Sequence, residues 1–209
     1  MNETKIDFLQ IIFFVIALPV LLFLKKPETG SYVNNLPIRG ELPWPLSHGE
    51  DRPKLLTFGM YVTPDPENNP IMPPERFTGY HTALDIEIIE EEVGKVVPVY
   101  TICEGLIAYT GIVEGYGGVI IQACTIQNQE VRVLYGHLDY KSFQVTTNSK
   151  PVKTDTIIAE LGDQHSAESG HTRKHLHLGI HKGPDIEFAG YVQSAAELDE
   201  FIDPLPLFE

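Results

Sequence analysis

Basic residues are scarce in this chain. Its 209 residues include 15 Lys and Arg against 29 Asp and Glu, which gives a formal net charge of −14. Proteins that bind nucleic acid need clustered basic side chains to neutralise phosphates, so the composition excludes a nucleic-acid partner. The same imbalance gives no long-range attraction to anionic lipid. Any substrate must therefore be held by local geometry.

Cysteine is rarer still. Two cysteines are too few for a disulfide framework. Cys103 and Cys124 lie in two β-type runs, 99–109 and 118–124, that are expected to pair as a hairpin. A disulfide between them requires an oxidising compartment, and two buried free thiols are the alternative. The sequence leaves both open.

Several familiar catalytic and nucleotide-binding motifs are missing. The chain has no His-Glu-x-x-His, Gly-x-Ser-x-Gly, Walker or Cys-x-x-Cys motif. The glycine-rich run Gly115–Gly118 is too short for a dinucleotide-binding loop and is typical of a hairpin turn. These absences leave the corresponding hydrolase and nucleotide-binding classes without support.

One long apolar run is present near the start of the chain. Residues Phe8–Leu24 are interrupted only by Gln10 and Pro19. About 17 to 20 such residues can cross a bilayer as one helix. No small-residue cleavage site follows, which favours an uncleaved anchor over a secretory signal peptide. Residues 1–26 are therefore predicted to be an N-terminal transmembrane helix.

The rest of the chain is predicted to form one domain. Apolar residues make up 43% of the sequence, enough for a packed core. Residues 27–53 are rich in Pro, Gly and Asn, which is typical of a linker. Residues 54–190 are predicted to form the domain, and residues 191–209 are predicted to be a C-terminal tail. A short helix is expected near 193–201.

Short β-type runs dominate the predicted domain, and convincing amphipathic helices are absent from it. The fold class is therefore expected to be all-β, built on antiparallel sheet. The expected strands are 55–62, 83–89, 96–109, 118–123, 131–135, 156–161 and 175–181.

Histidines and one aspartate recur at metal-ligand spacings. His81 and Asp85 form a His-x-x-x-Asp motif, and His175 and His177 form a His-x-His motif. Side chains alternate faces along a strand, so the last two imidazoles are expected on one side. Catalytic zinc sites use three protein ligands and keep a fourth position open. Taken alone, each motif is more often an exposed polar face or a chance pair.

Three motifs in a fixed order give a more specific signal. The chain reads Gly-Tyr-His-Thr-Ala-Leu-Asp-Ile at 79–86, Leu-Tyr-Gly-His-Leu at 134–138 and His-Leu-His at 175–177. Glycines and β-type runs between them match as well. Over about residues 55–182 the sequence resembles the M23 (LytM/lysostaphin-like) family of zinc metallopeptidases.

This resemblance implies an antiparallel β-sheet groove with a zinc site. His81, Asp85 and His177 would bind Zn²⁺, and His137 and His175 would be catalytic, flanking a zinc-bound water. Which of the two is the base stays open. The implied function is an endopeptidase that cuts peptide cross-links of bacterial peptidoglycan.

The implied chemistry also sets the expected location and partners. Lysines flank the apolar run on both sides, at Lys5 and at Lys25–Lys26, so charge does not decide its orientation. Cell-wall chemistry places the domain outside the cytoplasm, on a single-pass anchor in the cell membrane. A regulatory protein partner, and the bond that is cut, stay open. The alternative function is a non-catalytic wall-binding or hydrolase-activating domain of the same fold.

The chain departs from the family pattern beside the last motif. Arg173 and Lys174 stand where members often have Gly-Pro, and Leu178-Gly179 replaces Phe-Glu. These positions adjoin the expected zinc ligands but are not ligands themselves. The departures therefore leave the substrate preference of the domain open. The acidic run Glu90–Glu92 is expected to be a solvated turn; a hypothesis is that it restrains the groove.

The remaining histidines carry weaker predictions. His165 and His171 fall in a loop that forms a groove wall in the family, where they either contact substrate or are ordinary exposed residues. His181 is expected in a supporting or rim position rather than as a fourth ligand, and His48 lies in the predicted linker and carries no signal.

Overall fold

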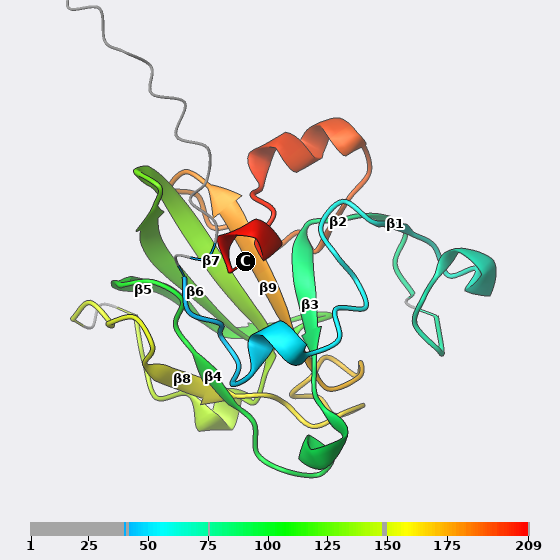
Figure 1. Ribbon diagram of the computed structural model, residues 1–209, viewed down its shortest axis with the longest axis horizontal. Helices are drawn as coiled ribbons and strands as arrows, with labels where there is room; N and C mark the ends of the chain where they lie inside the picture. Colours follow the sequence, from blue (N-terminus) through cyan, green and yellow to red (C-terminus); the bar gives the residue numbers. More distant parts are fainter. Residues whose placement is uncertain (1–39, 41, 75, 148–149, 209) are drawn as a thin grey trace, which may run out of the picture. The chain divides into compact units, whose positions relative to one another are not determined.

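The computed structural model describes residues 40, 42–74, 76–147 and 150–208 (Figure 1). The predicted transmembrane helix and residues 27–39 and 41 of the predicted linker lie outside the described residues. No described helix has the length and apolar composition of a membrane span. The helices in the described residues are short 3₁₀ turns of three to six residues.

A five-stranded antiparallel sheet forms the body of the domain, in the order β3-β9-β7-β6-β5. Its strands are β3 (Ala83–Glu87), β5 (Gly105–Val113), β6 (Gly117–Ile126), β7 (Gln129–Leu138) and β9 (His175–Lys182). The Ile, Val and Leu residues in these strands suit a pleated surface packed against neighbours. The expectation of an all-β, antiparallel domain is confirmed.

Two smaller sheets lie beside the large one. The first joins β1 (Tyr61–Val62), β2 (Gly79–His81) and β10 (Tyr191–Val192), and the second joins β4 (Pro98–Tyr100) and β8 (Ile157–Glu160). The 3₁₀ helix η5 (Ala195–Glu200) occupies the place where a short helix was expected.

Two expected strands were wrong in extent. Of the run 55–62 only β1 is a strand, because Gly59 turns the chain with φ +77°. The run 96–109 breaks between β4 and β5. There Thr101 donates its hydroxyl to the Lys153 carbonyl, and the Ile102 amide donates to the Tyr135 hydroxyl. These long-range hydrogen bonds replace the sheet ladder and cannot be seen in local sequence.

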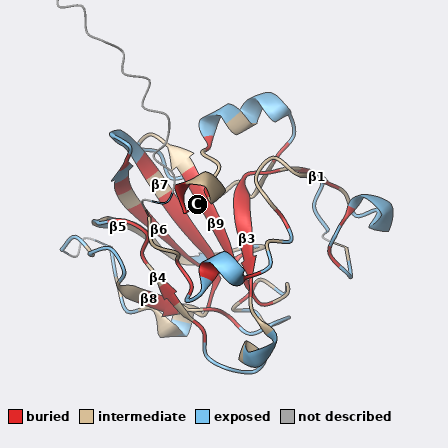
Figure 2. Ribbon diagram, viewed as in Figure 1, coloured by how far each residue is buried: buried red, intermediate tan, exposed pale blue. Residues whose placement is uncertain are grey.

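The core consists of buried residues of the large sheet and of the segments packed against it (Figure 2). Segments outside the predicted domain boundaries contribute to it. Leu46, in the predicted linker, is fully buried, and Trp44 stacks on Phe208 of the predicted tail with ring centroids 4.5 Å apart. Residues 42–53 and the tail therefore pack onto the domain.

A disulfide joins Cys103 to Cys124, which resolves the two alternatives left open by the sequence. The bond lies beside the β5–β6 hairpin, where Gly105 pairs with Cys124. The bond links the segment between β4 and β5 to β6 of the large sheet.

Candidate active site

The sheet register brings the first and last motifs together. His81 ends β2 and Asp85 lies in β3, and Asp85 stands directly opposite His177 of β9. His175 stands opposite Glu87 in the same register. Because alternate residues of a strand share a face, His175 and His177 point to the side that Asp85 occupies.

Three ligand-type atoms form a tight triangle in this place. His81 Nε2 lies 3.2 Å from His177 Nδ1 and 3.3 Å from Asp85 Oδ1. His177 Nδ1 lies 3.0 Å from Asp85 Oδ1. Ligand atoms about 2.0–2.1 Å from a tetrahedral ion are about 3.3–3.4 Å apart. The triangle therefore has the size of one face of a zinc tetrahedron.

The groups on the far side of each ring suit a proton there: a carbonyl fixes the tautomer of His81, and a hydroxyl that can accept lies beside His177. His81 Nδ1 donates to the Thr57 carbonyl at 3.3 Å, and His177 Nε2 faces the Tyr116 hydroxyl at 3.2 Å. With protons on those nitrogens, both inner nitrogens carry lone pairs. Burial lowers the pKa of His177 to about 4, so its ring is neutral. Three acceptors then converge on one buried point, a donor set that fits a divalent cation.

A β-bulge places His137 at the site. Gly136 and His137 of β7 stand opposite the single residue Val119 of β6, between the pairs Gly118–Leu138 and Ile120–Tyr135. His137 has φ +62°, which is uncommon for a residue with a side chain. Bulges of this kind re-aim side chains and are frequent beside active sites.

The ring of His137 is fixed through one nitrogen. Its Nδ1 donates to the carbonyl of Ser169 at 2.8 Å and lies 3.0 Å from that of Tyr116. The other nitrogen, Nε2, is left with a lone pair. Burial, reinforced by the neighbouring His175, lowers the pKa of His137 well below its usual range. The ring is therefore a neutral proton acceptor.

His175 has a different environment. Its Nδ1 donates to the Arg173 carbonyl at 3.0 Å, and its Nε2 lies 3.2 Å from Asp85 Oδ2. Both nitrogens therefore face oxygen acceptors. Its centroid is 4.4 Å from that of His137. The two catalytic candidates are therefore in contact but differ in hydrogen bonding.

The sequence profile of peptidase family M23 matches residues 79–188. The chain belongs to this family. A search of curated protein sequences finds no match. The M23 match covers the segment that carries all five candidate residues.

Solved structures with a similar fold include three of particular interest. A chain of the SpoIIQ–SpoIIIAH pore-forming complex is 16% identical, with 82% of this chain and 92% of that one covered and a TM-score of 0.51. LytU is 24% identical, with 73% and 83% covered and a TM-score of 0.46. Lysostaphin from Staphylococcus simulans is also 24% identical, with 61% and 43% covered and a TM-score of 0.43. The first likeness supports the fold of this M23 domain.

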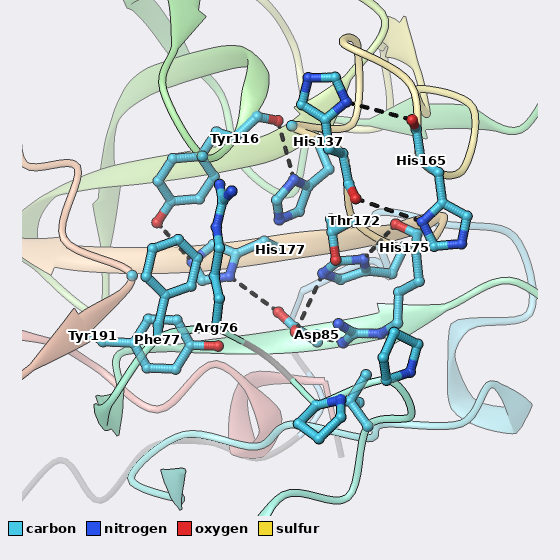
Figure 3. Close-up of a pocket in the computed structure, with 18 of the residues that line it drawn as sticks. Arg76, Phe77, Asp85, Tyr116, His137, His165, Thr172, His175, His177 and Tyr191 are labelled. Atoms are coloured by element: carbon cyan, nitrogen blue, oxygen red, sulfur yellow. Dashed lines mark hydrogen bonds and ion pairs between the residues drawn. The ribbon is translucent and has the colours of Figure 1, made fainter. Parts of the chain in front are cut away.

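A cleft of about 620 Å³ opens onto the cluster of histidines (Figure 3). It is lined by Asp85, Tyr116, His137, His175 and His177 together with Arg76, Phe77, His165, His171, Thr172, Arg173 and Tyr191, among others. One wall is aromatic: Phe77 stacks on Tyr191 at 5.5 Å, and Tyr191 lies 5.3 Å from the His81 ring.

The weaker predictions have mixed outcomes in the structure. His165 and His171 are exposed and line the cleft, so their contact with a substrate stays a prediction. His181 packs edge-on against Phe201 at 5.2 Å and is not among the residues lining the cleft. The run Glu90–Glu92 forms the 3₁₀ helix η3 outside the described cleft lining, and Glu92 pairs with Arg52.

Three residues of the site were missed from the sequence. Tyr116 holds His177, Arg173 binds Asp85 Oδ2 at 2.7 Å, and Glu87 binds Arg173. For Arg173 a signal existed, because its position departs from the family pattern. Tyr116 and Glu87 gave none, since their roles depend on which strands lie side by side.

Proposed function

We propose that this M23 domain is a zinc-dependent endopeptidase that hydrolyses peptide cross-links of bacterial peptidoglycan. The observation that carries the proposal is the convergence, at and directly behind one cleft, of three metal-ligand atoms and two further imidazoles. They come from three motifs separated by more than 30 residues each. A domain that only binds cell wall has no need to keep all five.

His81, Asp85 and His177 would hold the zinc ion through Nε2, Oδ1 and Nδ1. When bound, zinc lowers the pKa of a coordinated water and polarises the peptide carbonyl. The chain supplies the ligand tautomers through Thr57 and Tyr116. Such outer hydrogen bonds orient metal-binding histidines and raise their basicity.

His137 is assigned as the general base. Its Nδ1 proton is committed to the Ser169 carbonyl, which leaves Nε2 to take a proton from the attacking water. Its neutral state in the buried site favours this role, since a protonated ring cannot accept. The sequence alone did not distinguish it from His175.

His175 is assigned as the donor that stabilises developing negative charge. Its Nδ1 proton is held by the Arg173 carbonyl, so Nε2, which lies 3.2 Å from Asp85 Oδ2, is the nitrogen that would turn a proton toward the substrate oxygen. A fixed donor beside the scissile carbonyl lowers the barrier more than one in water, because it needs no reorganisation.

A location outside the cytoplasm is also part of this proposal. The Cys103–Cys124 disulfide supports it, because such bonds persist mainly in oxidising compartments. The single-pass membrane anchor in residues 1–26 remains a prediction. So does a regulatory protein partner: the similar SpoIIQ–SpoIIIAH chain belongs to a two-protein complex, but that likeness extends to the fold alone.

The test is to incubate the zinc-loaded, full-length chain with purified peptidoglycan and to identify the released muropeptides. We expect new peptide ends from the wild type and a loss of about 10²- to 10⁴-fold in rate for His137→Ala. His48→Ala, at an exposed histidine far along the chain from the motifs, is the matched control and keeps full activity. Binding without release by the folded, zinc-loaded wild type would indicate the non-catalytic wall-binding function instead.

A further inference from the structure

The two carboxylate oxygens of Asp85 make different contacts. Oδ1 faces His81 and His177 in the ligand triangle. Oδ2 points the other way, accepts from Arg173 Nη2 at 2.7 Å and lies 3.2 Å from His175 Nε2. The side chain is only 3% exposed, so water has little access to Oδ2. Oδ1 is therefore available to a metal ion, whereas Oδ2 is in contact with Arg173 and His175.

Arg173 is itself held by a second carboxylate. Its Nε lies 3.0 and 3.1 Å from the two oxygens of Glu87, and its Nη2 lies 2.8 Å from Glu87 Oε1. Glu87 is two residues after Asp85 on β3, so both carboxylates project from the same face. A guanidinium bound by two carboxylates in fork geometry has little freedom to rotate.

The segment that carries Arg173 is fixed by its neighbour. Lys174 is buried and donates to the Lys95 carbonyl at 2.8 Å and to Asp163 Oδ1 at 2.9 Å. Where the family often has Gly-Pro, proline would fix the backbone before the His-x-His strand. This chain fixes the same segment with two charged side chains, and one of them reaches Asp85.

We propose that Arg173, held by Glu87, is a positioning residue that confines Asp85 to monodentate binding through Oδ1 and so favours zinc over metals of higher coordination number. The inference rests on the metal site of the proposed function. Structural and catalytic zinc sites are mostly four-coordinate. Ions with six or more ligands often take a carboxylate through both oxygens, which Arg173 prevents here.

The test compares metal binding by full-length variants in the absence of any substrate. The variants are Arg173→Met, Arg173→Lys and Glu87→Gln. Zinc and manganese affinities are measured by competition with a chromogenic chelator, and coordination is followed by the visible absorption of bound Co²⁺. This absorption is strong for four-coordinate cobalt and weak for six-coordinate cobalt.

For Arg173→Met we expect zinc affinity to fall about 10- to 100-fold, as for other residues that orient a metal ligand. The preference for zinc over manganese should shrink, and the Co²⁺ absorption should weaken. Arg173→Lys keeps the charge without the fork and should lie between the wild type and Arg173→Met. Glu87→Gln should shift all three readouts in the same direction but less.

Glu92→Gln is the matched control. Glu92 also holds a buried arginine, Arg52, at two points, that pair is not among the residues lining the cleft, and the variant keeps the contact of Arg52 Nη1 with the Glu87 backbone carbonyl. It should lose stability while keeping the zinc affinity and Co²⁺ spectrum of the wild type. This separates an effect on Asp85 from a general effect of removing a buried ion pair.

Wild-type zinc affinity and an unchanged Co²⁺ spectrum in Arg173→Met would overturn the proposal. If that variant does not fold, the same result in both Arg173→Lys and Glu87→Gln overturns it. A wild-type chain that binds no zinc would instead contradict the metal site of the proposed function. Zinc binding without peptidoglycan hydrolysis would leave the role of Arg173 standing.

Discussion

The ring nitrogens of the site histidines are distinguished by what lies on their outer side. The Thr57 carbonyl leaves an inner lone pair on His81, and the Tyr116 hydroxyl is placed to accept from His177 Nε2 and so to leave one on His177. The Ser169 carbonyl leaves an outward lone pair on His137. In the proposed mechanism, metal ligation and proton transfer would therefore depend on groups that are not themselves ligands or catalysts.

Removing the Tyr116 hydroxyl should weaken metal binding. Tyr116→Phe deletes the partner of His177 Nε2, so the ring loses the contact that fixes its tautomer and orientation. We expect zinc affinity to fall about 10-fold, measured by chelator competition.

Tyr135→Phe is the matched control for this prediction. It removes another buried tyrosine hydroxyl, which binds Gln122 and the Ile102 amide away from the cleft. It should lower stability and leave zinc affinity unchanged. Equal zinc affinity in Tyr116→Phe and the wild type would mean that the hydroxyl does not orient His177.

At the scale of elements, the pairing of β3 with β9 makes the site. Strand positions 83–87 and 175–182 were close to those predicted from sequence, as were the candidate residues that the pairing brings together. The sequence could not give the register that sets Asp85 opposite His177. It also missed the bulge at His137 and the packing of Trp44 and Leu46, because these depend on contacts distant along the chain.

The element η3 (Glu90–Glu92) gives a prediction about pH. Arg52 donates to both oxygens of Glu92 at 2.6 Å, and this contact lowers the pKa of the Glu92 carboxyl. A carboxyl whose pKa is lower in the folded state stabilises the fold above its unfolded pKa, about 4.3, and loses that contribution as the pH falls through the folded pKa.

Glu92→Gln should therefore lower the free energy of unfolding at pH 7 by about 1–3 kcal/mol, because the buried Arg52 loses its charged partner. The difference from the wild type should shrink below about pH 4.3. Urea unfolding at pH 7 and at lower pH checks this. A difference that stays constant over the whole range would show that ionisation of Glu92 does not stabilise the fold.

At the scale of the whole molecule, an acidic chain carries its candidate site in a cleft. The net charge of −14 gives no attraction to anionic polymers, so recognition must take place within the cleft. The fold class and the five candidate residues were predictable because they are carried by strand patterns and motifs. The disulfide was not, because two cysteines in paired strands are compatible with either redox state.

The disulfide should stabilise the domain without acting on the site. Cys103 and Cys124 are 21 residues apart, and closing a loop of this size contributes about 3 kcal/mol in the chain-entropy view. We expect the double variant Cys103→Ser, Cys124→Ser to unfold at lower urea concentration by about that free energy and to keep wild-type zinc affinity. A loss of zinc affinity in the folded variant would instead couple the bond to the metal site.

The most direct test of the account is zinc removal and replacement on the full-length chain, with new amino ends on purified peptidoglycan as the readout. Chelation should abolish their formation, and about one equivalent of Zn²⁺ should restore it in the wild type. His177→Ala lacks one ligand and should not recover. Undiminished formation of amino ends by metal-free protein would contradict the assignment of His81, Asp85 and His177 as the zinc ligands of a peptidase.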